Sequence, residues 1–230
     1  NKYKMLACGR YKETKEVFSD HKRFVSSRGV GIQDFKLEKP WRPPSLVLEV
    51  DPPEHTKNRR FLSRALSPNK ISQLKDFFKK SADKLIFDLL QKKEIDGISD
   101  LAEIFPTTVF PEAVGLKKID KETLLGYGAM VFNALGPDNE FRKDAMSKGL
   151  SVLEKINKQC LEENIDADGL AKDIYRSTAE KSEEDQLAGM LVRSLLSAGI
   201  DTTVSAIGNL LWCFTDNPEQ FQLVKDNKSL

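Results

Sequence analysis

The chain is predicted to fold mostly as α-helix with a little strand. Apolar residues recur at helical spacing through most of its 230 residues, and several helix starts are marked by proline or by a capping side chain. No linker rich in glycine or serine divides it. A composition of 40% hydrophobic and 31% charged residues is ordinary for a soluble globular protein and supports one large domain or two small ones.

The first elements are expected in the N-terminal fifth. Residues 5–8 are interpreted as the end of a short strand, and a helix follows near residues 11–19. Residues 22–50 are expected to form a long irregular loop because they hold two glycines and three prolines. Such loops are usually functional or disordered. The apolar stretch at 45–50 favours an ordered loop that returns to the core.

The helices that follow have clear start signals. Asp51 is expected to cap a helix whose first turn holds two prolines and which runs to about Leu66. Ser67-Pro68 starts another, to about Lys93, and residues 182–185 resemble a capping box that opens a long helix. Further helices are predicted over residues 98–114, 121–135, 138–163 and 167–177, with a last one after Asn217-Pro218.

Residues 187–214 are expected to form one long buried helix, because apolar side chains occur on nearly every face. Burying a carboxylate costs several kcal/mol unless something compensates. One face of this helix nonetheless carries a stripe of polar and small residues, which is either a polar seam between packed helices or a functional surface. At about 100° per residue, one face of this helix holds Ser194, Ala198, Asp201, Thr202, Ser205 and Asn209.

Two motifs give this stripe a context. Residues 198–203, Ala-Gly-Ile-Asp-Thr-Thr, resemble the oxygen-activation motif of the cytochrome P-450 family, the haem-thiolate monooxygenases. Residues 51–60 resemble the family's haem-propionate helix and lie the expected distance upstream. The loop at 26–45 is similar to the bacterial branch that demethylates para-substituted benzoates. The resemblance implies that residues 1–230 are the N-terminal and central part of a single cytochrome P-450 domain.

The resemblance also implies haem b as cofactor. His55 and Arg59 share a helix face, so charge-assisted hydrogen bonds from both would anchor a propionate. Ala198 and Gly199 would keep the helix thin where haem and oxygen approach. The other cations of the propionate helix have two interpretations, a solvated face or a docking surface for an acidic electron carrier; they are Lys57, Arg60 and Arg64.

Asp201 and Thr202 resemble the family's acid–alcohol pair. The reaction needs two protons at the outer oxygen of bound dioxygen. A hydroxyl can hold that oxygen and a water by hydrogen bonds, and a neighbouring carboxylate can relay protons from solvent. These two residues are therefore the candidate catalytic groups.

An arginine inside an apolar helix, such as Arg193, requires an anion or several acceptors. An internal salt bridge to a glutamate is one interpretation. In the benzoate branch, positions matching Arg42 and Ser45 in the loop, and Arg193-Ser194 in the helix, are associated with recognition of the substrate carboxylate. Phe132 matches an aromatic wall of the pocket. Leu135 stands where the branch has a second aromatic residue, which leaves the preferred ring substituent open.

The family's iron ligand, a cysteine in a Cys-x-Gly loop, is not matched by Cys8, Cys160 or Cys213, and no Glu-x-x-Arg motif occurs. The axial cysteine is therefore expected outside these residues, no residue of the chain is assigned to a metal, and the chain alone is expected to be inactive.

Charge is unevenly spread although the net charge is only +1. Residues 1–80 hold 19 Lys/Arg against 9 Asp/Glu, and residues 81–230 hold 17 against 26. An acidic protein partner is favoured over nucleic acid, because the basic residues are not interleaved with aromatic ones. Scattered cysteines, the lack of a visible signal peptide, and charged residues inside the apolar helix favour a cytoplasmic protein that does not enter the membrane.

The leading hypothesis is a haem-dependent monooxygenase that inserts one O2-derived oxygen into a small aromatic carboxylic acid by hydroxylation or O-demethylation. Its electrons would come from an iron–sulfur ferredoxin with an NAD(P)H-dependent reductase. The alternatives are a non-catalytic all-α fragment or relic that binds a ligand or partner, and an unrelated all-α binding module.

Overall fold

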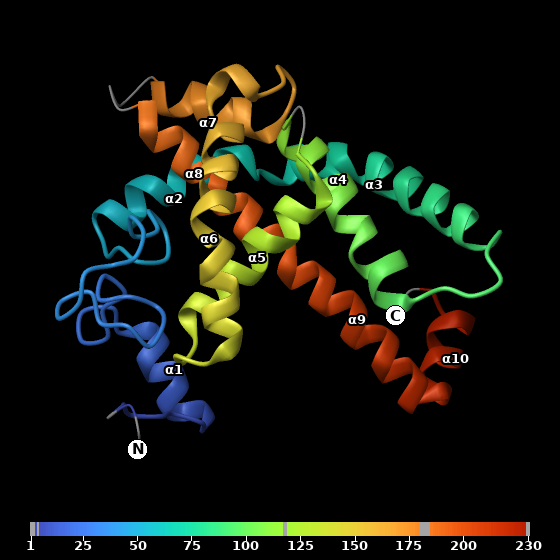
Figure 1. Ribbon diagram of the computed structural model, residues 1–230, viewed down its shortest axis with the longest axis horizontal. Helices are drawn as coiled ribbons and strands as arrows, with labels where there is room; N and C mark the ends of the chain where they lie inside the picture. The colour runs from blue at the N-terminus through green and yellow to red at the C-terminus, as the bar shows by residue number, and fades with distance from the viewer. Residues whose placement is uncertain (1–2, 4, 117–118, 180–184, 229–230) are drawn as a thin grey trace.

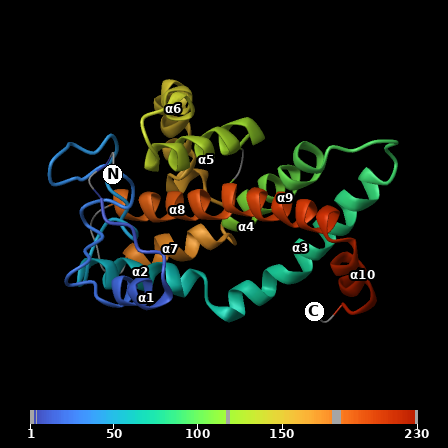
Figure 2. The same cartoon turned by 90° about the horizontal axis from the view of Figure 1, so that it is seen from below.

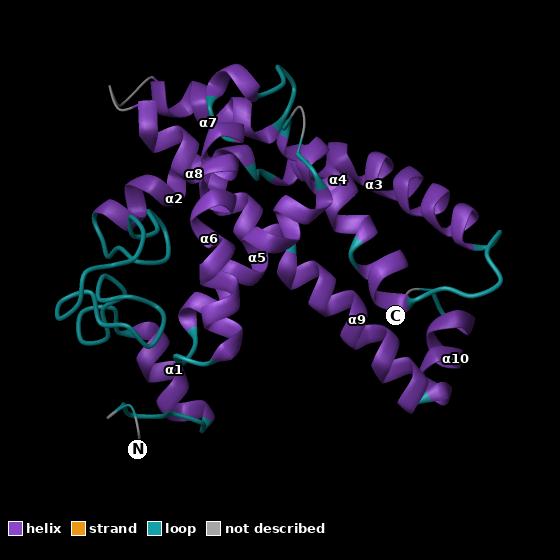
Figure 3. Cartoon of the chain, viewed as in Figure 1, coloured by secondary structure: helices purple, strands orange, loops and turns teal. Residues whose placement is uncertain are grey.

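The computed structural model describes residues 3, 5–116, 119–179 and 185–228 (Figure 1). Helix accounts for 68% of the described residues, and helices dominate the view by secondary structure in Figure 3. Among the described residues, β pairing is limited to one isolated antiparallel bridge between Leu116 and Ile165. The predicted mostly-α class is therefore confirmed.

The helices follow one another with short connections after the long N-terminal loop. In chain order the described α-helices are α1 (Tyr11–Ser19), α2 (Glu54–Ala65), α3 (Pro68–Leu89), α4 (Ile104–Val114), α5 (Lys121–Leu135), α6 (Glu140–Gln159), α7 (Leu170–Ala179), α8 (Asp185–Gly199), α9 (Asp201–Asp216) and α10 (Pro218–Asp226). A π-helix, η1 (Gly97–Ala102), precedes α4, and a short 3-10 helix, η2 (Glu162–Asn164), precedes α7.

Local sequence explains several boundaries. The Asp120 carboxylate accepts the Thr123 backbone N–H at 2.7 Å and starts α5 at the predicted residue. Asn139 accepts the Arg142 N–H at 3.0 Å and starts α6. Side chains that accept otherwise unpaired N–H groups thus fix where these two helices begin.

Some expectations about the first elements are wrong. Residues 5–8 are irregular, because no described segment pairs with them as a strand. The Asp51 carboxylate does not cap α2. It accepts the backbone N–H groups of Ser26 and Ser27 at 2.8 and 3.2 Å, so it fastens the long loop instead. The side-chain hydrogen bond from Ser27 and these backbone bonds hold the pKa of Asp51 below its usual value. The proposed capping box at 182–184 lies outside the described residues.

The helices form layers around α8 and α9. Figure 2 shows these two helices running nearly end to end through the middle, with α5 and α6 on one side and α2, α3 and α7 on the other. Helix α8 contacts α4, α5, α6 and α7, whereas α9 contacts η1, α5, α8 and α10. The buried core therefore surrounds α8. Its fully buried members include Val114, Leu124, Met130, Ile156, Ile174, Leu191, Val192, Leu196 and Ile200.

Two glycines allow the segment before α7 to cross the end of α4. Gly115 caps α4 with φ +89°, a left-handed conformation that favours glycine. A Cβ added to Gly169 would overlap the Cα of Gly115. The Asp166 N–H donates to the Gly115 carbonyl at 2.8 Å beside the isolated bridge. This crossing places α7 against α8 and α2.

The expected single helix over residues 187–214 is interrupted. α8 ends at Gly199 and α9 begins at Asp201, with Ile200 between them at φ −92° and ψ −74°. The Thr202 hydroxyl donates back to the Ala198 carbonyl across the break. Hydroxyls that bond the carbonyl four residues back bend helices, and glycine weakens them. These two features explain the break.

The expectation that this whole segment is buried holds for α8 but is wrong for α9. No described residue of α9 is fully buried, and Leu210 and Trp212 are 52% and 68% exposed. The neighbours of α9 lie on part of its circumference, so the rest of the helix faces solvent. By length and composition alone, residues Gln186–Asp216 could cross a membrane. Of the 18-residue apolar stretch within them, 33% is buried inside the molecule. Arg193 and Asp201 oppose insertion.

Asp201 lies where α9 starts and packs against α5. A Cβ added to Gly128 would be 2.9 Å from the Asp201 Cβ, so glycine at 128 makes room for this side chain. The carboxylate is half-buried, and no described residue donates a hydrogen bond to it. Burial raises the pKa of the Asp201 carboxyl above its ordinary value of 3.8.

This raised pKa predicts a pH dependence of stability. The folded protein holds the Asp201 proton more tightly than the unfolded chain does. The stability therefore falls as pH rises from the unfolded pKa, about 3.9, through the raised folded pKa. We expect Asp201→Asn to match the parent at low pH and to be more stable at neutral pH, measured by urea unfolding across a pH series.

Asp216→Asn, at the exposed far end of α9, is the control and should follow the parent at every pH. A loss of stability at neutral pH in Asp201→Asn would contradict the prediction. It would mean that the dipole at the N-terminus of α9, which favours the ionised form, outweighs burial.

Candidate functional site

A cavity between the long loop, α5 and α8 gathers most of the predicted substrate residues. Its volume is about 30 Å³, about the space of one water molecule. The loop contributes Arg42 and Ser45, and α8 contributes Arg193 and Ser194, as the sequence predicted. The remaining lining residues are Leu46, Leu48, Tyr127, Val131, Met190 and Ser197.

The loop side of the cavity is organised around Glu49. Arg42 Nη1 lies 2.8 Å from Glu49 Oε2, and the Ser45 backbone N–H donates to the same oxygen at 2.6 Å. The Asn58 side chain, on α2, donates to the Leu46 carbonyl at 2.8 Å. Hence a buried carboxylate and a helix side chain hold this part of the loop on the core.

The Ser45 hydroxyl is free to donate. Its oxygen accepts the backbone N–H groups of Val47 and Leu48 at 3.4 and 3.1 Å, and no acceptor for its hydrogen lies in the described residues. Ser194 differs, because its hydroxyl already donates to the Met190 carbonyl at 3.0 Å. Of the two predicted serines, Ser45 is therefore the hydrogen-bond donor and Ser194 an acceptor.

Arg193 is a buried cation on an apolar helix. It is 8% exposed, and its Nη1 donates to Asn157 Oδ1 at 2.8 Å. In the described part of the chain no carboxylate lies within ion-pair distance of it, so the alternative of an internal salt bridge to a glutamate finds no support there. An arginine has five N–H donors, and one amide oxygen uses few of them. The others are available to a ligand.

Helix α5 forms the far wall with Tyr127 and Val131. Tyr127 is 4% exposed, and burial raises the pKa of its phenol to about 12, so it remains a neutral donor. Phe132, the predicted aromatic wall, does not line this cavity and is 40% exposed. Leu135 lies elsewhere, where its carbonyl accepts the Ile32 N–H at 3.1 Å.

Besides the apolar lining residues, three polar residues of this site were not predicted. Tyr127 lies one turn before Val131, Ser197 lies one turn after Arg193, and Glu49 lies in the apolar stretch after the loop. Helical spacing from Arg193 indicates Ser197, whereas Tyr127 has no such spacing from Phe132. Sequence gives no comparable signal for Glu49, because its pairing depends on how the loop turns.

The predicted oxygen-activation residues lie at the junction of α8 and α9, outside the cavity. Ala198 and Thr202 are exposed and Gly199 is half-buried. A Cβ at Gly199 would overlap the Phe110 ring of α4. The space that glycine leaves at 199 is therefore occupied by the Phe110 ring, and the expected approach of haem at this residue stays a prediction.

His55 and Arg59 lie one turn apart on α2, half-buried and exposed respectively. Neither has a hydrogen-bond or ion-pair partner among the described residues. Two neighbouring nitrogen donors with no partner among the described residues suit the carboxylates of a haem, so the donor chemistry of this helix fits that group.

The cysteines do not form a metal site. Cys8 and Cys213 are exposed, and Cys160 is buried at the end of α6, where burial raises the pKa of its thiol to about 12. No cluster of three or more His, Cys, Asp or Glu side chains able to hold a metal ion occurs among the described residues.

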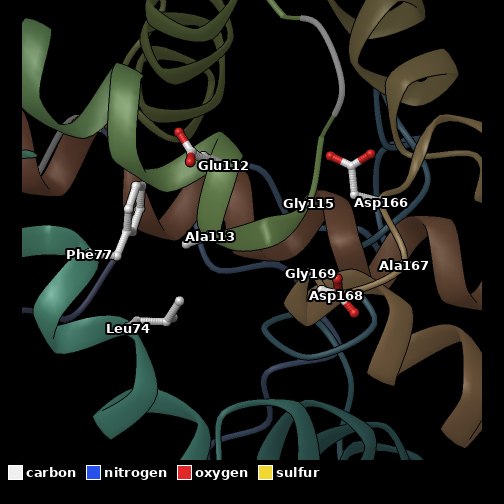
Figure 4. Close-up of a pocket in the computed structure, with 9 residues that line it drawn as sticks. All are labelled: Leu74, Phe77, Glu112, Ala113, Gly115, Asp166, Ala167, Asp168 and Gly169. Carbon is white, nitrogen blue, oxygen red and sulfur yellow. The ribbon is translucent and has the colours of Figure 1, made fainter.

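A separate open cavity lies between α3, the end of α4 and the segment before α7 (Figure 4). Phe77 and Leu74 point into it from α3, and Glu112 lies across from them on α4. Asp166 and Asp168 contribute carboxylates from the other side. None of the predicted site residues lies there, so this cavity has no part in the candidate site.

Comparison with known proteins places these features in a family. No protein-family model matches the chain. It is 44% identical over 233 residues to cytochrome P450 CYP199A2 of Rhodopseudomonas palustris, covering 100% of this chain and 56% of that protein. It is 25% identical to vitamin D(3) 25-hydroxylase of Pseudonocardia autotrophica, covering 96% of this chain and 54% of the relative.

Solved structures agree in fold. Cytochrome P450 TxtC superposes with a TM-score of 0.73 at 19% identity, over 94% of this chain and 57% of that one. Epothilone B-bound cytochrome P450epoK gives 0.71 at 19% identity, over 96% and 58%. At 44% identity over its whole length and with this fold, the chain is homologous to cytochromes P450, and it spans about half the length of the curated relatives it matches.

Proposed function

We propose that the chain is part of a haem-dependent monooxygenase that inserts one O2-derived oxygen into a small aromatic carboxylic acid, by hydroxylation or O-demethylation. The observation that carries the substrate class is the cavity that joins Arg42 and Ser45 of the loop to Arg193 and Ser194 of α8. Homology to cytochromes P450 supports the reaction class.

The donors of this cavity select a carboxylate. Arg193 has N–H groups without a partner and no carboxylate partner among the described residues, and the Ser45 hydroxyl has a hydrogen that can be donated. A hydrogen bond to a charged group contributes about 1.5–3 kcal/mol. At about 30 Å³ the cavity admits a carboxylate group but not a ring, so the ring would lie at its edge against Leu46, Val131 and Met190. A monoanionic ring acid meets both requirements.

His55 and Arg59 would hold the haem propionates, because both are nitrogen donors without an internal partner among the described residues. When bound, haem supplies the activation of oxygen, and the exposed Ala198 would lie against it, whereas Gly199 is covered by the Phe110 ring. The axial cysteine is proposed to come from outside these residues, because none of the three cysteines precedes x-Gly. The 230 residues alone are therefore proposed to bind ligand without catalysis.

Asp201 and Thr202 are the proposed proton-handling pair. Burial raises the pKa of the Asp201 carboxyl, so this group holds a proton at a higher pH than an exposed aspartate does. The exposed Thr202 hydroxyl is one residue away and donates to the Ala198 carbonyl. Its oxygen can accept a hydrogen bond while that bond is kept. To relay a proton, the hydroxyl would turn away from the Ala198 carbonyl and release its own hydrogen as it accepts another from solvent or from Asp201.

The electron donor is proposed to be an iron–sulfur ferredoxin with an NAD(P)H-dependent reductase. Lys57, Arg60 and Arg64 are exposed on α2, and opposite charge favours fast encounter with an acidic carrier. A cytoplasmic location fits such soluble partners.

The substrate proposal predicts charge selectivity in binding. The protein should bind 4-methoxybenzoate more tightly than 4-methoxybenzamide, and Arg193→Gln should remove most of that preference, about ten- to a hundredfold. Isothermal calorimetry at low ionic strength measures both ligands. Arg10→Gln, a change at an exposed arginine, should behave like the parent. Equal affinity of the parent for acid and amide would overturn the substrate class.

The haem proposal predicts a role for α2 in retention. In a fusion of this chain with the remaining segment of the Rhodopseudomonas relative, His55→Ala with Arg59→Ala should speed haem loss to a haem-scavenging protein, because two propionate donors are removed. The matched control, Lys57→Ala with Arg60→Ala, removes two cations from the same helix. Identical haem-loss rates in the two double variants would contradict the anchoring role.

A further inference from the structure

Glu49 is a buried carboxylate that touches both loop residues of the cavity. Its side chain is 1% exposed, and that of its partner Arg42 is 10% exposed. Besides the 2.8 Å contact, Arg42 Nη2 lies 3.4 Å from Glu49 Oε1, so both carboxylate oxygens face the guanidinium. The Ser45 N–H completes the set at 2.6 Å.

The net charge of this arrangement affects which ligands the cavity can bind. The cavity is lined by two guanidinium groups, those of Arg42 and Arg193, and by no carboxylate. Glu49 lies behind Arg42 and neutralises it, whereas Arg193 is held by the uncharged Asn157. The net charge at the cavity is therefore one positive charge. Without Glu49 it would be two.

We infer that Glu49 is a positioning residue that sets the charge of the cavity and so restricts it to ligands carrying one negative charge. This inference rests on the proposed binding of an aromatic acid. A monoanion balances the single uncompensated cation when it enters. A dianion would carry a second negative charge into a poorly solvated site beside a carboxylate, where like charges repel strongly.

Holding the Ser45 backbone in place does not by itself require a carboxylate at position 49. The Ser45 N–H could be held by a neutral acceptor, as the Asn58 side-chain N–H is held by the Leu46 carbonyl. A carboxylate adds a charge that geometry alone does not require. Glutamine at 49 keeps the shape and an acceptor oxygen for the Ser45 N–H but removes that charge, so it separates the two roles.

The test compares benzene-1,2-dicarboxylate with its monoamide, which has nearly the same shape and one charge fewer. Binding is measured by calorimetry at mildly alkaline pH, where both carboxyl groups are ionised. The readout is the affinity for the dianion divided by the affinity for the monoanion, which loss of general stability does not change. Four proteins are compared: the parent, Glu49→Gln, Arg42→Gln and the double variant.

We expect the ratio to follow net charge. Glu49→Gln should raise it about tenfold and Arg42→Gln should lower it about tenfold, which is the effect of one unit charge at about 10 Å in a medium of effective dielectric constant about 20. The double variant should return to the parent ratio, because the cavity again carries one positive charge. If Glu49→Gln alone does not fold, the ratios of Arg42→Gln and the double variant, each compared with the parent, still test the inference.

Two different results would overturn the inference that Glu49 sets the charge of the cavity. If both ligands bind and the ratio is the same in all the variants, Glu49 only shapes the loop, while the aromatic-acid proposal stands. If neither the monoamide nor 4-methoxybenzoate binds the parent, the proposed substrate class fails and the charge rule fails with it.

Discussion

The guanidinium of Arg193 is a positive charge on an apolar helix, and its compensation constrains the rest of this molecule. Burying an isolated ion costs several kcal/mol even after relaxation. Here α6 supplies only the Asn157 amide, and no described carboxylate pairs with Arg193. The charge is therefore tolerated because a cavity lies beside it and gives access to solvent or to an anion. The proposed anionic ligand would compensate this charge.

The surrounding elements follow from that constraint. α8 can be apolar on nearly all sides because α4, α5, α6 and α7 cover it, and this leaves the cavity side to the long loop. The loop stays in place through buried polar contacts rather than through regular structure, chiefly Glu49 with Arg42 and Asn58 with Leu46. The break at Ile200 then directs Asp201 against Gly128 and leaves the rest of α9 partly exposed. Of these two helices, α8 is thus buried beside the cavity, and α9 is open and begins with the proposed proton-handling pair.

Helix positions could be predicted from the sequence wherever a local signal sets them, as Asp120 does for α5. Local spacing also placed Arg193 and Ser194 together, and the resemblance placed Arg42 and Ser45 near them. The predictions that failed depend on contacts between segments that lie far apart in the sequence. Asp51 has the right sequence position for a cap, yet its carboxylate is used by the loop. The pairing of Glu49 depends on a turn that the sequence does not specify, and the exposure of α9 depends on which segments pack beside it. Phe132 was assigned by analogy, and the rotation of α5 presents Val131 and Tyr127 instead.

The central claim is that the buried Arg193 side chain binds the carboxylate of an aromatic acid. Nitrogen NMR of the arginine side chains reports on this directly, because the Arg193 signals can be assigned with the Arg193→Gln variant. Titration with 4-methoxybenzoate should shift the Arg193 Nε and Nη resonances to saturation, and 4-methoxybenzamide should leave them nearly unchanged. Binding of the acid with no change at Arg193, or equal shifts with the amide, would contradict the claim and make Arg193 a structural residue held by Asn157.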